Sequence, residues 1–107
     1  MDRIVILGAA ESGVGAAILA KQKGFDVFVS DMGAIKDKYK TQLDAHGIAW
    51  EEGQHTEEKI LNAKEIIKSP GIPREAPMVQ KAMNHGIGVV SEIEFAARYT
   101  NAKMVCI

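Results

Sequence analysis

The feature that most constrains the fold is a short apolar run, Arg3–Leu7, that leads directly into the glycine-containing segment Gly8–Gly13. Its apolar residues are mostly β-branched and do not alternate with polar ones, which is typical of a parallel strand buried on both faces. Gly8 permits a tight turn at the end of the strand, and Ser12 is expected to cap the helix that follows. The segment therefore predicts a strand, a glycine turn and a helix, in that order.

The same turn predicts an anion site, because a strand that enters a helix in this way directs several backbone N–H groups at one point. A dinucleotide fingerprint reads G-x-G-x-x-G, whereas the glycine positions here hold Gly8, Ala10 and Gly13. Ala10 argues against a nicotinamide dinucleotide as the ligand but is compatible with a phosphate site. The alternative is that the turn serves only the close packing of helix on strand. We expect Gly13 and Gly15 to let the helix pack closely on the sheet. Glu11 should point away from a phosphate or meet a cation.

Strand-like and helix-like segments alternate along the whole chain. The expected strands are 3–7, 26–30, 48–50, 65–68 and 88–90, and the expected helices are 12–23, 35–46, 56–62, 76–85 and a last one ending near 99. Parallel neighbours need crossover connections, which are right-handed. We therefore predict an α/β fold, a Rossmann-like doubly wound parallel sheet of about five strands with helices on both faces.

Polar or glycine-rich segments follow three of these strands, so they should meet at one rim of the sheet. The first is the turn at Gly8. The second is Asp31, about 20 residues further on, where a carboxylate commonly meets the ribose or base of a nucleotide. The alternative for Asp31 is a solvated acid that starts a turn or caps a helix.

The third segment is Ser69–Pro73, a stiff loop with few hydrogen-bond donors. Pro70 favours an extended Ser69, and Gly71 permits a positive φ. The loop would then present the Ser69 hydroxyl and the Gly71 N–H at the rim. A plain connection between strand and helix remains the alternative.

Composition excludes several classes of protein. A chain of 107 residues is long enough for one domain, and a net charge of −1 gives no case for nucleic acid or an anionic membrane. We expect no signal peptide, and no apolar run approaches the ~20 residues of a membrane-spanning helix. The single cysteine, Cys106, excludes an internal disulfide, fits the cytoplasm and is expected in a core. The three histidines lack metal-ligand spacing and are expected to be structural: His46, His55 and His85.

The last residues, 102–107, read as the beginning of another buried strand. We expect residues 1–102 to form one domain and residues 103–107 to begin a second domain that is cut off. The alternative is that this strand joins the same sheet as its last member.

Four segments resemble the N-terminal domain of the Mur ligases: Ile4–Gly15, Val29–Asp31, Ile67–Pro73 and Ser91–Phe95. The resemblance covers the whole chain, and the S-P-G-I-P loop and the E-I-E-F segment after a G-x-x-x-S-G turn are specific to the family. It implies a cytoplasmic, monomeric, three-domain ligase of peptidoglycan synthesis. The N-terminal domain would hold the UDP part of the substrate, a central domain ATP and Mg²⁺, and a C-terminal domain the amino acid.

The resemblance also implies roles for particular residues. The backbone of Ala10, Glu11, Ser12 and Gly13 would cradle the diphosphate. Asp31, with the backbone of Met32 and Gly33, would meet the uracil, and Ser69, Pro70 and Gly71 would line the diphosphate and sugar. Ala10 stands where a glycine is more usual, and Gly33 offers no side chain to cover the base. No catalytic residue and no cofactor site is expected in this chain.

Two other functions remain open from the residues. One is the nicotinamide-binding domain of a dehydrogenase, against which Ala10 argues. The other is a regulatory domain that senses a nucleotide without catalysis.

Overall fold

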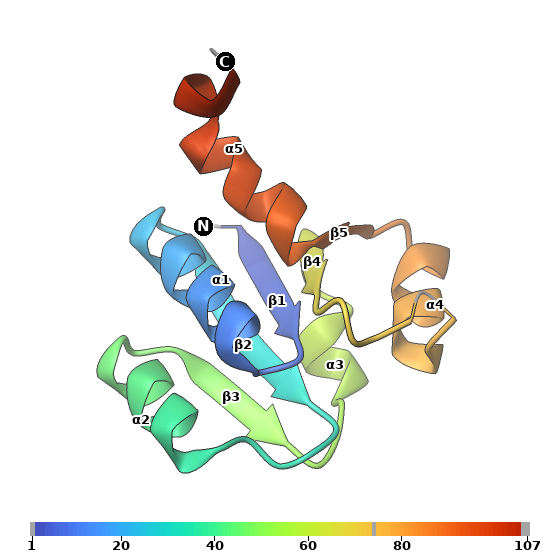
Figure 1. Cartoon of the computed structure of the whole chain (residues 1–107). Coiled ribbons are helices and arrows are strands. Elements are labelled where there is room, and N and C mark those ends of the chain that lie inside the picture. Colours follow the sequence, from blue (N-terminus) through green and yellow to red (C-terminus); the bar gives the residue numbers. More distant parts are fainter. Residues whose placement is uncertain (1, 74, 106–107) are drawn as a thin grey trace.

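The computed structural model describes residues 2–73 and 75–105, in which strands and helices alternate (Figure 1). The strands are β1 (Arg3–Leu7), β2 (Asp26–Asp31), β3 (Ala49–Glu52), β4 (Glu65–Lys68) and β5 (Gly88–Ser91). The helices are α1 (Glu11–Gln22), α2 (Asp37–Ala45), α3 (Glu57–Ile60), α4 (Pro77–Asn84) and α5 (Glu92–Val105).

All neighbouring strands pair in parallel, in the order β3-β2-β1-β4-β5. From β1 the chain builds outward through β2 and β3, then crosses back to place β4 on the other side of β1. The strand order therefore reverses between β1 and β4, and ligands of such sheets bind beyond the carboxyl ends of the strands at this point. The predicted doubly wound α/β fold is confirmed.

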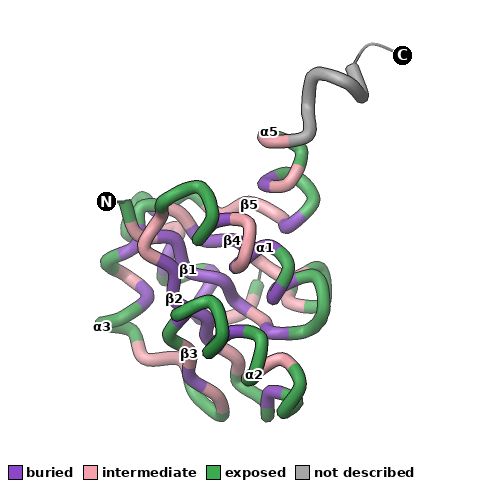
Figure 2. Tube along the Cα trace, turned by 90° about the vertical axis from the view of Figure 1, so that its left-hand side faces the viewer, coloured by how far each residue is buried: buried purple, intermediate pink, exposed green. Residues whose placement is uncertain are grey.

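Each face of the sheet has its own apolar core, because successive strand residues point to opposite faces. Ile4 and Ile6 of β1 face α1, α2 and α5, whereas Val5 and Leu7 face α3 and α4. Figure 2 shows the central strands as buried along their length. Burial on both faces explains why β1 is apolar without alternation.

Some predictions for single residues, at the start of α1 and in the loop after β4, are wrong. The helix begins at Glu11 with Ala10 as its N-cap residue, so Ser12 lies inside the first turn and does not cap the helix. An added Cβ at Gly15 would meet nothing within 4 Å, so this glycine is not needed for close packing. Gly71 is not among the glycines with positive φ in the described residues, so its loop turns without a left-handed residue.

The strand expected at 102–107 is also wrong for residues 102–105, which continue α5 (Figure 1). A helix satisfies its backbone hydrogen bonds within one segment, whereas a strand needs a neighbour with which to pair. Cys106 lies outside the described residues. The domain boundary expected at residue 102 stays a prediction.

Candidate functional site

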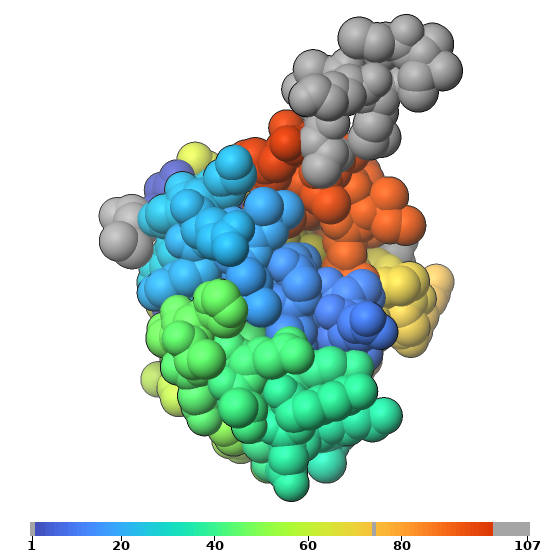
Figure 3. Space-filling model, turned by 60° about the vertical axis from the view of Figure 1, so that its left-hand side comes forward, coloured from blue at the N-terminus to red at the C-terminus, as the bar shows by residue number. Residues whose placement is uncertain are grey.

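The first turn of α1 offers backbone N–H groups that no protein atom accepts. In the described part of the chain, the N–H groups of residues 10–13 form no hydrogen bond, whereas Val14 N–H donates to the Ala10 carbonyl at 2.9 Å. Ala10, Glu11 and Ser12 are exposed. Figure 3 shows blue residues from the early part of the chain reaching the surface between its green and orange parts. The positive end of a helix with free N–H groups is an anion site.

Two glycines bring this turn close to its neighbours. Gly8 has a φ of +100°, and a Cβ there would lie 2.7 Å from the Ser69 Cβ atom. A Cβ on Gly13 would lie 2.1 Å from the Gly8 carbonyl oxygen, which is closer than atoms can approach. The start of α1 is therefore packed directly onto the end of β1, and β1 onto the loop after β4.

Asp31 connects this turn to the end of β2. Its Oδ2 atom accepts the Ala9 N–H at 2.8 Å, and its Oδ1 atom accepts the Gly33 N–H at 2.8 Å. The loop after β2 also carries Met32, a large apolar side chain that is 61% exposed. The structure thus brings Asp31 beside the α1 turn, as its place at a strand end predicts.

Ser69 adjoins the same turn from the other side of β1. Its N–H donates to the Leu7 carbonyl at 3.0 Å, and its hydroxyl accepts the Gly71 N–H at 3.4 Å. The two groups that the sequence predicts at the rim, the Ser69 hydroxyl and the Gly71 N–H, therefore bond to one another. Lys68 Nζ donates to the Ile72 carbonyl at 2.8 Å, which holds the loop closed.

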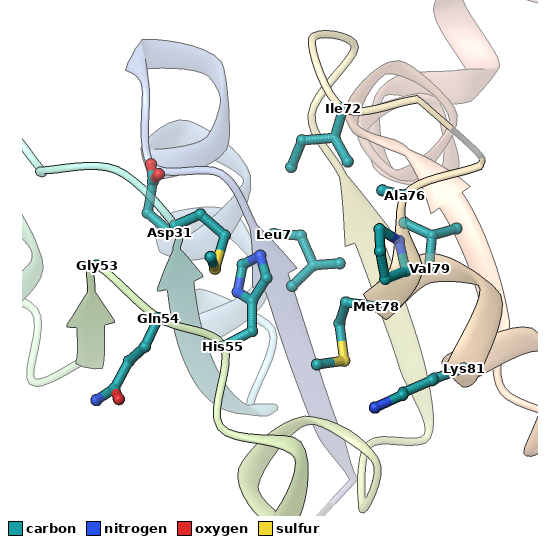
Figure 4. Close-up of a pocket in the computed structure, with 12 residues that line it drawn as sticks. Leu7, Asp31, Gly53, Gln54, His55, Ile72, Ala76, Met78, Val79 and Lys81 are labelled. Atoms are coloured by element: carbon teal, nitrogen blue, oxygen red, sulfur yellow. The ribbon is translucent and has the colours of Figure 1, made fainter.

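A cavity of about 460 Å³ opens beside this rim, on the face of the sheet that α3 and α4 cover (Figure 4). Its lining comes from the ends of β1 and β2, the loop after β3, the loop after β4 and α4. Most of its walls are apolar, with Leu7 as the floor and Ile72 and Met78 to the side. Asp31 and His55 are among the polar residues that line it (Figure 4).

His55 belongs to a buried hydrogen-bond network that the sequence analysis missed. Its Nδ1 atom lies 2.6 Å from the hydroxyl of Ser30, a fully buried residue of β2. The Ser30 hydroxyl also lies 2.8 Å from Oε2 of Glu51 on β3. Glu51 in turn accepts the N–H and hydroxyl of Thr56, so that Thr56 does not cap α3 with its side chain.

The network shifts the pKa of both titratable members. Burial would raise the pKa of Glu51, but hydrogen bonds from Thr56 and Ser30 outweigh it and hold the pKa below its ordinary value. Burial lowers the pKa of His55, although the charges of Glu51 and Asp31 act in the opposite direction. Glu51 is therefore ionised and His55 neutral at neutral pH.

Glu92, the first residue of α5, lies behind the α1 turn. It is buried, and its Oε2 atom lacks a hydrogen-bond partner among the residues that the structure describes. This atom would lie 3.2 Å from a Cβ on Gly13. A carboxylate on this side adds to the reasons why no side chain fits at Gly13.

Within residues 2–73 and 75–105, no group of three or more His, Cys, Asp or Glu side chains could hold a metal ion. No helix in this part of the chain is both long and apolar enough to cross a membrane. His46 and His85 lie at the C-terminal ends of α2 and α4, where the sequence predicted them.

Residues 2–91 match the family described as Mur ligase MurD-like, N-terminal domain. The chain is 69% identical over 107 residues to the UDP-N-acetylmuramoylalanine--D-glutamate ligase of Bacteroides fragilis. It is 71% identical to the same-named enzyme of Bacteroides thetaiotaomicron over 107 residues. In both cases the match covers 100% of this chain and 24% of the relative, so the chain spans about a quarter of these curated relatives.

Solved structures agree in fold. A UDP-N-acetylmuramate:L-alanyl-gamma-D-glutamyl-meso-diaminopimelate ligase from Neisseria meningitides aligns with a TM-score of 0.79 and 25% identity, over 92% of this chain and 31% of that one. A pseudomurein peptide ligase type C from Methanothermus fervidus aligns with a TM-score of 0.77 and 26% identity, over 92% of this chain and 20% of that one.

Proposed function

This chain belongs to the Mur ligase family as a MurD-like N-terminal domain, and we propose that it anchors the uridine diphosphate part of UDP-N-acetylmuramoyl-L-alanine. One observation carries the proposal. Asp31 lines an apolar cavity and accepts the N–H of Ala9, the residue that directly precedes the unpaired N–H groups at the start of α1. A nucleoside diphosphate has the matching chemistry, with two phosphoryl groups joined to a flat base.

The diphosphate would accept the backbone N–H groups of Ala10, Glu11, Ser12 and Gly13. The exposed position of Glu11 leaves its carboxylate free to point into water, away from the phosphates. The loop Ser69–Gly71 would line the diphosphate and sugar from the opposite side of β1. We propose that Asp31 lies beside the uracil and, through its bonds to Ala9 and Gly33, fixes the two loops on which the nucleotide rests.

The names of the relatives support a proposal for the activity of the full-length protein. We propose an ATP-dependent, cytoplasmic ligase that phosphorylates the L-alanine carboxylate, after which the amine of D-glutamate attacks the acyl phosphate and forms an amide. ATP and Mg²⁺ would bind to the central domain, and D-glutamate to the C-terminal domain. Here this chain would supply remote binding energy that positions the reacting carboxylate, with no catalytic residue of its own.

Calorimetric titration of the full-length protein with UDP and with NAD tests the substrate class. We expect UDP to bind and NAD to bind far more weakly, because Ala10 replaces the glycine that admits a dinucleotide pyrophosphate. NAD binding without UDP binding would favour the dehydrogenase domain. An ATP-dependent assay with UDP-N-acetylmuramoyl-L-alanine and D-glutamate then separates a ligase from a domain that only senses nucleotides.

A further inference from the structure

We propose that His55 determines the base specificity of this nucleotide site, by presenting its Nε2 atom as a hydrogen-bond acceptor to the N3–H of uracil. The inference rests on the proposed function and deepens it. It concerns a residue on the loop between β3 and α3, outside the segments on which the family resemblance rests.

The hydrogen bonds of the network fix which nitrogen of His55 carries the proton. The Ser30 hydroxyl lies 2.8 Å from Oε2 of Glu51 and 3.1 Å from the Gln54 carbonyl, which both only accept, so its single hydrogen goes to one of these two oxygens. The Ser30 oxygen must then accept from His55, which places the hydrogen of the neutral ring on Nδ1. The Nε2 atom is left with a free lone pair. Burial favours this neutral form.

The ring of His55 projects into the cavity between Asp31 and Leu7 (Figure 4). Both oxygens of Asp31 already accept a backbone N–H, one from Ala9 and one from Gly33. The Nε2 atom of His55, by contrast, accepts no hydrogen bond from any described residue. It is therefore the acceptor in this part of the cavity that remains available to a ligand.

A nucleotide with its phosphates at α1 can reach this acceptor. Leu7, on the cavity floor, directly precedes the turn Gly8–Gly13, here named the phosphate turn, and Asp31 both lines the cavity and accepts the Ala9 N–H of that turn. The apolar walls suit a flat ring, whose burial removes its faces from water.

The acceptor distinguishes the two pyrimidines found in ribonucleotides, uracil and cytosine. Uracil carries a hydrogen on N3 and can donate it to Nε2. Cytosine has a lone pair at N3, which would face the lone pair of Nε2 and leave both without a partner. A buried polar group that loses its partner costs more than an average hydrogen bond contributes.

The test compares the dissociation constants of UDP and CDP for the full-length protein. We expect the wild type to prefer UDP, and His55→Leu to reduce that preference about five- to tenfold, chiefly by weakening UDP. His55→Gln, whose amide oxygen can accept a hydrogen bond, should keep part of the preference. His46→Leu, the same change at an exposed histidine at the end of α2, should keep all of it.

An unchanged ratio of UDP to CDP affinity in His55→Leu would overturn this inference while leaving the proposed function intact. Failure of the wild type to bind UDP at all would overturn both. Should His55→Leu not fold, ¹⁵N spectra of the wild-type histidines decide, because UDP must shift the Nε2 resonance of His55 more than CDP does. Equal shifts would count against the inference.

Discussion

At the scale of single residues, α1 offers a matched pair of substitutions. Gly13→Ala would place a Cβ 2.1 Å from the Gly8 carbonyl, so the helix must move away from the phosphate turn. We expect a loss of about 1–3 kcal/mol in the free energy of unfolding, together with weaker UDP binding. Urea unfolding and calorimetry measure the two effects.

Gly15→Ala is the control for this pair, since a Cβ there meets nothing within 4 Å. It should stabilise the protein by about 0.5–1 kcal/mol, because alanine favours a helix interior over glycine, and it should leave UDP binding unchanged. Equal effects of the two changes would contradict the close packing of Gly13.

The lowered pKa values of Glu51 and His55 in the buried network predict how the free energy of unfolding changes with pH. The pKa of Glu51 is held below its ordinary value of 4.5, so its contribution is present above that value and is lost as the pH falls through the folded pKa. The pKa of His55 is lowered from 6.5, so protonation favours the unfolded chain and stability declines as the pH drops below 6.5. Urea midpoints measured from pH 7 to pH 3 should therefore fall in both ranges.

Substitutions separate the two titrations. His55→Leu should flatten the decline just below pH 6.5, and Glu51→Gln the decline below pH 4.5, each leaving the other in place. Glu58→Gln, a change at an exposed residue of α3, should alter neither. A decline below pH 6.5 that persists without His55 would assign it to another group.

At the scale of elements, the backbone N–H groups at the start of α1 are free, whereas those of the turn that precedes it are hydrogen-bonded among the described residues. Gly8 N–H donates to the Ser30 carbonyl and Ala9 N–H to Asp31, whereas the N–H groups of Glu11, Ser12 and Gly13 have no acceptor within residues 2–73 and 75–105. In the free protein, hydrogen exchange should be slower for the first pair than for these three. UDP should slow the exchange of the three by roughly tenfold or more, since a bound phosphate accepts their hydrogens.

The first turn of α2 provides the control for this exchange experiment. It also begins without a side-chain cap, at Asp37 after Lys36, but it lies away from the cavity. UDP should leave its N–H exchange unchanged. Equal slowing in both helices would indicate a general stabilisation of the fold and not a bound phosphate at α1.

At the scale of the whole molecule, the fold and half of the site could be predicted from local patterns. Uninterrupted β-branched runs predict buried parallel strands, and glycines after helices mark their ends, so the alternation and the layers follow. Because parallel strands end at one edge, the sequence alone predicts that Asp31 and Ser69 lie beside Gly8.

The rest of the site depends on contacts between distant strands. Ser30, Glu51 and His55 are unremarkable in the sequence, and only the pairing of β2 with β3 makes them one network. The helical end of α5 was missed because a strand pairing that the sequence suggested does not form in the described residues. Residues 102–105 are as compatible with a strand as with a helix until it is known whether a neighbouring strand is present. Local patterns carry no information on either point.

The last prediction concerns the ligand as a link between the two halves of the sheet. A nucleotide that spans the α1 turn and the cavity contacts loops after β2 and β3 on one side of the switch point and after β4 on the other. UDP at about 100 times its dissociation constant should raise the free energy of unfolding by about 2.7 kcal/mol. Orthophosphate can bind only at the α1 turn and uridine only in the cavity. At the same concentration, each should therefore raise the free energy of unfolding much less than UDP does. If either alone matched UDP in urea unfolding, the phosphate turn and the cavity would not form one site.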